Sequence, residues 1–217
     1  MGAGERVNIH TVMVTYNRLE LTKRAVESYL NTVTGPWSMI VVDNNSTDGT
    51  TEWLKDEAPT EISSALLTEN KYPGYATNFG WNIAPNGTVL LHRADNDFVF
   101  LPGWETHVRL MFSINERLGQ LGLRTDEEEL HNEHNVGGNC VIRKQLWDEG
   151  LRYDERPWPV ISRKTPGYTE DSYLSPAVAR MGWEWSRVTQ PCIQPISRED
   201  PDDPYYRRTW ADRGINQ

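Results

Sequence analysis

The stretch VNIHTVMVTYNRLELTKRAVESYLNTVTGPWSMIVVDNNSTDGTTEWL, residues 7–54, decides the fold. It contains two apolar, β-branched runs, residues 7–15 and 37–42, and each ends in a cluster of polar residues. Runs of this kind are typical of buried parallel strands. The segment between them places its apolar residues on one helical stripe, which Gly35-Pro36 ends. The residues of that stripe are Leu19, Val26, Leu30 and Val33.

The same alternation continues along the chain and predicts an α/β fold. We expect a helix to follow the second run, with Thr47 as its cap. Strands alternating with helices indicate a mostly parallel, Rossmann-like sheet flanked by helices, in a single domain. Further strands are expected at 62–68, 88–91, 136–142 and 183–188, and further helices at 73–84, 101–118 and 170–181.

Length and composition exclude several classes of protein. The chain has 217 residues, enough for one domain with a core of its own. Its net charge of −9 argues against a surface built mainly to bind phosphate backbones. No stretch approaches the roughly 20 apolar residues of a membrane-spanning helix. The N-terminus lacks a secretory pattern and there are two cysteines, Cys140 and Cys192, so we expect a cytoplasmic protein with reduced thiols.

The polar clusters that end the strands are the candidate site. Ligands of open parallel sheets bind at the carboxyl ends of the strands. Asp95-Asn96-Asp97 follows an apolar strand, where two carboxylates could share a divalent cation and reach a ribose hydroxyl. Such a triplet by itself more often marks a capped turn, in which Asp and Asn bond their own backbone.

Ordered motifs connect these clusters to a known family. They are VMVTYNR at 12–18, VVDNNSTDGT at 41–50, ENKYPGYATNFGWNIA at 69–84, the DND triplet at 95–97 and TEDSYL at 169–174. In order and spacing they resemble the nucleotide-sugar domain of glycosyltransferase family 2, which has the GT-A fold, over about residues 7–190. The resemblance implies transfer of a sugar from a nucleoside diphosphate donor to a hydroxyl, usually with inversion.

The resemblance also implies which residues meet the donor. Thr15 and Tyr16 would bracket a pyrimidine, and Arg18 would face phosphate. Asn44 stands where many relatives have a second acid, so uracil and thymine both stay open as the base. Asn78 would either fix its loop or contact the nucleotide. The implied donor-binding residues are Thr15, Tyr16, Asn17, Arg18, Asp43, Asn44, Gly74, Asn78, Asp95 and Gly138.

The reaction centre follows from the same resemblance. Asp97 would ligate Mg²⁺ or Mn²⁺, and Asp95 would lie toward the ribose or the metal's water shell. Glu170-Asp171 matches the catalytic acidic pair of the family, with Asp171 as the general base. Many relatives have a histidine ligand later in the chain. This sequence has no histidine beyond His134, and Gln190 and Gln194 lie near that place.

Two further groups of residues are candidates for metal binding and for sugar stacking, and each also has a simpler explanation. His131 and His134 have metal-ligand spacing, but their acidic surroundings favour a solvated loop, and they are left out of the site. Trp158, Trp183 and Trp185 could stack on a sugar or base, or pack in the core.

The sequence therefore predicts a GT-A glycosyltransferase that uses a UDP- or dTDP-sugar. Residues 7–100 would bind the nucleotide sugar, 101–190 would hold the acceptor and catalytic groups, and 191–217 would form a tail. The acceptor could be a glycan, a protein or a hydroxylated base in DNA of the kind found in phages, and a non-catalytic nucleotide-sugar-binding protein is the alternative class. The basic residues that would suit DNA, ranked behind glycan, are Arg143, Lys144, Arg152, Arg156, Arg163, Lys164, Arg207 and Arg208.

Overall fold

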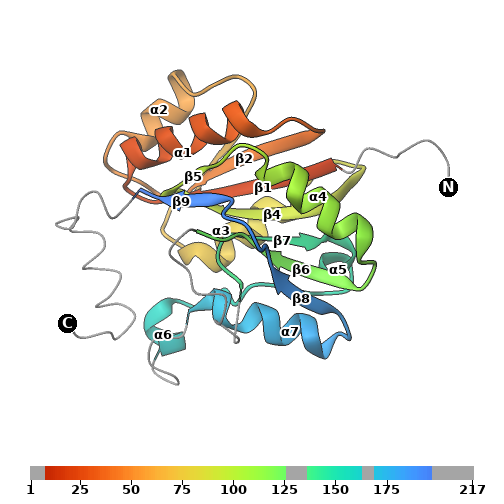
Figure 1. Ribbon diagram of the computed structural model, residues 1–217. Coiled ribbons are helices and arrows are strands. Elements are labelled where there is room, and N and C mark those ends of the chain that lie inside the picture. Colours follow the sequence, from red (N-terminus) through yellow and green to blue (C-terminus); the bar gives the residue numbers. More distant parts are fainter. Residues whose placement is uncertain (1–7, 126–135, 163–168, 197–217) are drawn as a thin grey trace.

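A seven-stranded mixed sheet forms the centre of the molecule in the computed structural model, which describes residues 8–125, 136–162 and 169–196 (Figure 1). Its strand order is β3-β2-β1-β4-β7-β6-β8. All neighbouring pairs are parallel except those that β7 makes with β4 and β6. The strands are β1 (Asn8–Thr15), β2 (Trp37–Asp43), β3 (Ser63–Leu66), β4 (Thr88–Asp95), β6 (Leu118–Gly122), β7 (Cys140–Arg143) and β8 (Glu184–Arg187).

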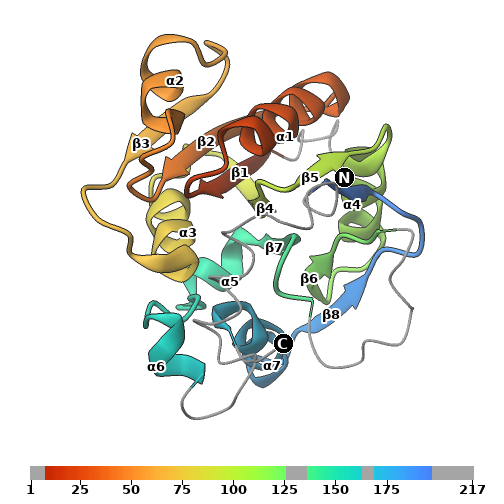
Figure 2. The same cartoon turned by 90° about the vertical axis from the view of Figure 1, so that its left-hand side faces the viewer.

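Helices cover both faces of this sheet (Figure 2). One face packs on α1 (Leu19–Thr32), α2 (Thr50–Asp56) and α4 (Trp104–Ile114). The other packs on α3 (Tyr72–Asn82), α5 (Lys144–Asp148) and α7 (Leu174–Arg180). Alternate residues of β1 point to opposite faces, so Met13 lies in the first core and Val12 in the second. The α/β prediction is confirmed.

Smaller elements complete the described ranges. A two-stranded antiparallel sheet joins β5 (Phe98–Phe100) to β9 (Ile193–Pro195), and the backbone N–H of Ile196 donates to the carbonyl of Asp97 at 2.8 Å. A short α6 (Trp158–Ser162) precedes a single 3₁₀ turn, η1 (Glu170–Tyr173). None of the helices in the described ranges has the length and apolarity that crossing a membrane requires.

Several boundaries differ from those predicted from the sequence: the strand expected at 136–142 begins at Cys140, and the helix expected at 170–181 begins as the 3₁₀ turn η1. The helix expected over 101–118 ends at Ile114, and residues 118–122 form the buried strand β6 instead. A Cβ on Gly119 would lie 2.7 Å from the Cβ of Trp183, so this strand needs a glycine because of its tertiary packing. The predicted Thr47 cap is also wrong. Helix α2 begins at Thr50, whose N–H donates to the Asp48 carboxylate at 3.1 Å.

A buried carboxylate, Glu105, connects α4 to the turn before β2. It accepts hydrogen bonds from the backbone N–H groups of Thr34 and Gly35 and pairs with Arg109. The Glu105 side chain is 1% exposed. Although burial works against the charged form, these donors hold the pKa of Glu105 below its usual value of 4.5.

We expect Glu105→Gln to lower the free energy of unfolding at pH 7 by about 2–3 kcal/mol, the usual scale for hydrogen bonds to a charged group. Because the folded pKa is lowered, the stabilisation is present above about pH 4.5 and disappears as the pH falls through the folded pKa. Urea titrations at pH 7 and pH 3 test this. A difference between wild type and variant that does not shrink at pH 3 would contradict it.

Candidate active site

Two segments far apart in the sequence bring carboxylates together at one end of β4. Asp95 ends β4, Asp97 follows it, and Asp171 lies in η1. Gly138 lies between two of them: a Cβ built on it would be 3.6 Å from Asp95 Oδ2 and 3.7 Å from Asp171 Oδ2. The carboxylates and Gly138 that the sequence nominated separately therefore line one small space.

Burial and like charges dominate the electrostatics of Asp95. Burial, followed by the neighbouring carboxylates of Asp97, Asp171 and Glu170, raises the pKa of Asp95 to about 6, against the lowering effect of Arg93. Its backbone N–H donates to Asn139 Oδ1 at 2.8 Å, and Asn139 Nδ2 donates back to Asp95 Oδ2 at 3.2 Å. This two-way pair fixes the orientation of the Asp95 carboxylate.

The two acids of the Glu170-Asp171 pair have different surroundings. Glu170 is 2% exposed, and its two oxygens bind Arg93 Nη2, at 2.8 Å, and Trp158 Nε1. Asp171 is more exposed, faces the space beside Gly138 and accepts a hydrogen bond from the Thr169 hydroxyl. The geometry favours Asp171, and not the predicted catalytic Glu170, as the group that can meet a ligand. Trp158 is a buried donor to that structural acid.

Asp97 is paired with a cation of the chain itself. Arg18 Nη1 lies 2.9 Å from Asp97 Oδ2, and the two side chains are 9% and 15% exposed. The sequence predicts that Arg18 faces phosphate, and its guanidinium does lie at the carboxylate cluster. The middle residue, Asn96, turns inward and donates to the hydroxyls of Thr15 and Thr22 at 3.2 and 3.0 Å. The triplet thus places two carboxylates at the cluster, on either side of an amide that holds the loop.

The polar end of β2 is held by hydrogen bonds within the chain. Asp43 accepts from the Ser46 N–H at 3.0 Å and from the Thr51 hydroxyl, and Asn44 accepts from the Lys71 N–H at 2.8 Å. Both side chains are buried, at 1% and 2% exposed. Their contacts shape the loops at the rim, and a direct donor contact stays a prediction for both.

The end of β1 is connected to the same loop. Asn17, at φ 47°, accepts a hydrogen bond from the Thr47 N–H at 2.7 Å through its side chain, and its own N–H donates to the Ser46 hydroxyl at 2.9 Å. Tyr16 beside it is half-buried. Thr15, Tyr16 and Asn17 therefore lie at the rim as predicted, and their contact with a base stays a prediction.

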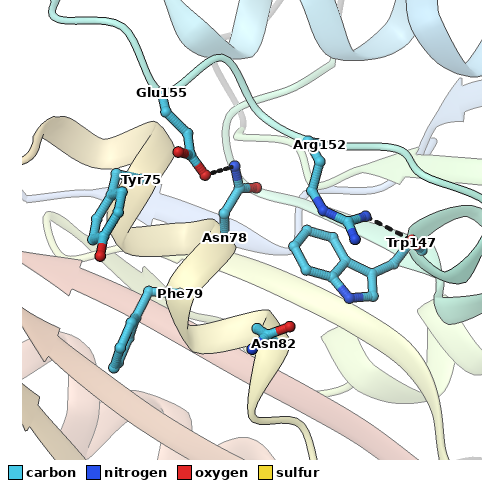
Figure 3. Close-up of a pocket in the computed structure, with 7 residues that line it drawn as sticks. All are labelled: Tyr75, Asn78, Phe79, Asn82, Trp147, Arg152 and Glu155. Carbon is cyan, nitrogen blue, oxygen red and sulfur yellow. Dashed lines mark hydrogen bonds between the residues drawn. The ribbon is translucent and has the colours of Figure 1, made fainter.

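Helix α3 is fixed to the segment that follows α5 by Gly74 and Asn78. Asn78 bonds the backbone of Tyr153 in both directions at 3.0 Å, and it donates to Glu155 at 2.9 Å (Figure 3). The structure thus supports the loop-fixing role of Asn78. A Cβ on Gly74 would lie 2.0 Å from the Asp154 carbonyl oxygen. The close approach that Gly74 allows is therefore to the chain's own backbone.

Figure 3 shows the hydrogen bond between Asn78 and Glu155. These two residues help to line an open depression of about 210 Å³. Arg152 stacks over the Trp147 ring with Cζ 3.4 Å from its centroid. The depression is lined by residues other than the carboxylate cluster: Tyr75, Asn78, Phe79, Asn82, Trp147, Arg152 and Glu155.

Several other sequence candidates lie elsewhere. His131, His134, Arg163, Lys164, Arg207 and Arg208 are outside the described residues. Arg143 donates to three backbone carbonyls, and Arg156 pairs with Asp154, so these arginines bind the chain itself. Trp183 and Trp185 pack against the second core. Gln190 and Gln194 are exposed, and Gln194 lies opposite Val99 in the β5–β9 pair.

Arg93 is the residue that sequence reasoning missed. It lies inside β4, is 6% exposed and contacts both Asp95 and Glu170. The strand predicted at 88–91 stops short of Arg93, so no sequence pattern indicated a buried cation here. In the structure β4 continues to Asp95, and a buried arginine needs a charge partner. The partner comes from residue 170, which no local pattern connects to residue 93.

Comparisons with known proteins agree with this geometry. Residues 11–114 match the family model described as glycosyl transferase family 2. The match covers 104 of the 217 residues of the chain, just under half. The resemblance drawn from the motifs is confirmed over this range, which contains β1 to α4 and both Asp95 and Asp97. Comparison with curated protein sequences finds no match to the chain.

Solved structures show that the fold extends beyond the range of the family 2 match. A mannosyltransferase from Pyrobaculum calidifontis, in complex with GDP-Man and Mn²⁺, superposes with a TM-score of 0.70 at 18% identity, over 96% of this chain and 61% of that one. Residues 1–349 of S. aureus TarS superpose with a TM-score of 0.66 at 14% identity, over 95% of this chain and 64% of that one. The same fragment in complex with UDP-GlcNAc superposes with a TM-score of 0.66 at 14% sequence identity, over 86% of this chain and 58% of that one. This chain spans less than two thirds of each.

The oxygen ligands at the end of β4 fit a divalent cation that a substrate helps to bind. Asp95 and Asp97 offer hard carboxylate oxygens from one strand end, and Gly138 leaves the space beside Asp95 open. Across the described ranges there is no group of three or more His, Cys, Asp or Glu side chains placed to hold a metal ion. Mg²⁺ is commonly held by one or two carboxylates together with substrate phosphates and water, which matches this arrangement.

We expect the Asp95 carboxyl of the metal-free protein to titrate near pH 6. Asp97→Asn removes one of the negative charges that raise this pKa, so the variant should titrate at lower pH. Carbon-13 NMR of the side-chain carboxyls across pH 3 to 8 measures both values. An Asp95 titration that is the same in wild type and variant would contradict the coupling between the two carboxylates.

Proposed function

We propose that this chain is the catalytic domain of a family 2 glycosyltransferase, which moves a sugar from a nucleotide-sugar donor to an acceptor hydroxyl. The observation that carries the proposal is that Asp95 and Asp171 meet beside Gly138, with Asp97 close enough to Asp95 to raise its pKa. Two carboxylates at a strand end and a third on a facing turn provide one face for a diphosphate and one for an attacking hydroxyl. Structural neighbours whose titles name GDP-Man, UDP-GlcNAc and UDP support a nucleotide-sugar donor.

The donor is proposed to be a UDP- or dTDP-sugar bound at the rim formed by the ends of β1 and β2. Thr15, Tyr16 and Asn17 would border the base, with the loop carrying Asp43 and Asn44 beside them. Hydrogen bonds already hold these loops, so little ordering would be required when the nucleotide binds. Arg18 would approach the diphosphate from its place beside Asp97.

Asp97 and Asp95 would hold Mn²⁺ or Mg²⁺. Bound there with the donor, the cation would neutralise charge on the diphosphate leaving group. The mannosyltransferase neighbour, whose title names Mn²⁺, supports this proposal. The two-way pair with Asn139 keeps the Asp95 carboxylate facing the donor side.

Asp171 is proposed as the general base. An inverting displacement needs a base on the face of the sugar opposite the leaving diphosphate. Asp171 lies across Gly138 from Asp95, and its neighbour Glu170 anchors the turn in the interior. Asp171 would remove the proton of the acceptor hydroxyl while that oxygen forms the bond to the sugar carbon. The acceptor class stays open, with a glycan preferred.

The direct test is a donor screen. Thermal stabilisation of the protein by UDP-, dTDP- and GDP-sugars is measured with and without Mn²⁺, followed by mass spectrometry of products formed with candidate acceptors. Stabilisation by a nucleotide sugar together with hydrolysis or transfer supports the enzyme. Binding without turnover on any acceptor or water would favour the non-catalytic alternative.

We expect Asp97→Asn to abolish Mn²⁺-dependent donor binding while the fold stays intact, because the variant loses a charged ligand. Isothermal titration of the donor with and without Mn²⁺ measures this, with circular dichroism as the check of the fold. Asp95→Asn is the comparison and should have the milder effect. Donor affinity and Mn²⁺ dependence equal to wild type in Asp97→Asn would remove Asp97 from the metal site.

We expect Asp171→Asn to keep donor affinity near wild type and to lower transfer by about 10²-fold or more, the scale for losing a positioned general base. Isothermal titration and product analysis by mass spectrometry measure the two effects separately. Thr169→Val is the matched control, since it removes the neighbouring hydroxyl and keeps the carboxylate. Transfer at the wild-type rate by Asp171→Asn would rule out Asp171 as the base.

A further inference from the structure

Arg93 is a buried cation directly beneath the carboxylate cluster. Its side chain is 7% exposed, and its Nε lies 3.4 Å from Asp95 Oδ1. Its Nη2 lies 2.8 Å from Glu170 Oε1, and that side chain is 2% exposed. A single guanidinium therefore joins the strand that carries Asp95 to the turn that carries Asp171.

A third contact of Arg93 connects it to the glycine segment 137–138, which lies beside Asp95 and Asp171. Its Cζ lies 4.9 Å from the centroid of the Tyr153 ring, in a cation–π arrangement. The Tyr153 hydroxyl donates to the carbonyl of Gly137 at 2.8 Å. Gly137 precedes Gly138, whose backbone separates Asp95 from Asp171. Arg93 thus contacts Asp95 directly, and it is connected to Asp171 through Glu170 and to Gly138 through Tyr153 and Gly137.

The turn η1 depends on this anchor for its place. Glu170 is held by Arg93 on one oxygen and by Trp158 on the other. Asp171 is the next residue, so its position follows from where Glu170 is fixed. A planar guanidinium can hold two carboxylates at a set separation, which a flexible ammonium does less well.

We propose that Arg93 is a positioning residue that sets the spacing between the Asp95-Asp97 strand end and Asp171. This inference rests on the proposed function for its catalytic consequence. Arg93 is buried and does not meet the substrate. It acts through Glu170 on Asp171, and through Tyr153 on the glycine backbone between the acids.

The test compares Arg93→Met and Arg93→Lys with wild type. We expect Arg93→Met to lower kcat by about 10²-fold, the scale of a small misplacement of reacting groups, with the KM for the donor nearly unchanged. Arg93→Lys should restore part of the loss, since a lysine can still pair with Glu170. If Arg93→Met does not fold, Arg93→Met combined with Glu170→Gln removes both charges and keeps an acceptor for Trp158.

Arg109→Met is the matched control, because it breaks another interior ion pair, with Glu105, away from the strand ends. It should lower the melting temperature and leave kcat unchanged. Equal losses of kcat in Arg93→Met and Arg109→Met would overturn the proposal, as would a neutral double variant with wild-type kcat.

Amide hydrogen exchange of η1 gives a readout that does not need activity. The Ser172 N–H donates to the Thr169 carbonyl at 3.1 Å, and we expect its protection to fall in Arg93→Met and to stay in Arg109→Met. Unchanged protection of η1 in Arg93→Met would overturn the positioning role. This result is independent of whether wild-type protein transfers sugar, so failure of the proposed function is distinguishable from failure of this inference.

Discussion

Four carboxylates, those of Asp95, Asp97, Glu170 and Asp171, meet where β4 ends, and their mutual repulsion is the constraint around which this end of the molecule is built. Like charges in a poorly solvated place destabilise one another, as the raised pKa of Asp95 indicates. Two arginines offset the repulsion. Arg93 binds Asp95 and Glu170 from below, and Arg18 binds Asp97 from the side.

The cost of burying Arg93 explains why its surroundings are so specific. Burial alone would lower its pKa, and the charges of Glu170 and Asp95 raise it above the usual value instead. A buried ion pair is weak evidence of net stabilisation, because desolvation opposes the attraction between the charges. Its contribution here is geometric, since a buried cation paired with Asp95 and Glu170 fixes where the end of β4 and η1 lie relative to each other.

The polar residues at the rim combine structural and proposed functional roles. Asp43 and Asn96 use their side chains to hold neighbouring loops, and Asn78 holds the segment after α5. Loops held in this way expose backbone and nearby side chains in a fixed arrangement. Such preorganisation reduces the ordering that a nucleotide sugar would require on binding.

The sequence by itself determined the α/β class, the strands and helices of residues 8–95 within a few residues, and the polar clusters at the strand ends. These features depend on local patterns, namely apolar runs, helical stripes and the order of the motifs. The same patterns misplaced residues 118–122, where two glycines and a short apolar run do not distinguish a strand from a helix end.

Only the tertiary structure decided which nominated residues face the site and which hold it together. Glu170 and Asp171 are adjacent in the sequence, yet one is buried against Arg93 and the other faces Gly138. Gly74 meets the backbone of Asp154, and β7 runs antiparallel to β4. Residue 93 contacts residue 170, and residue 74 contacts residue 154, only because the chain packs in this way. Such contacts join residues far apart in the sequence, so local sequence patterns do not predict them.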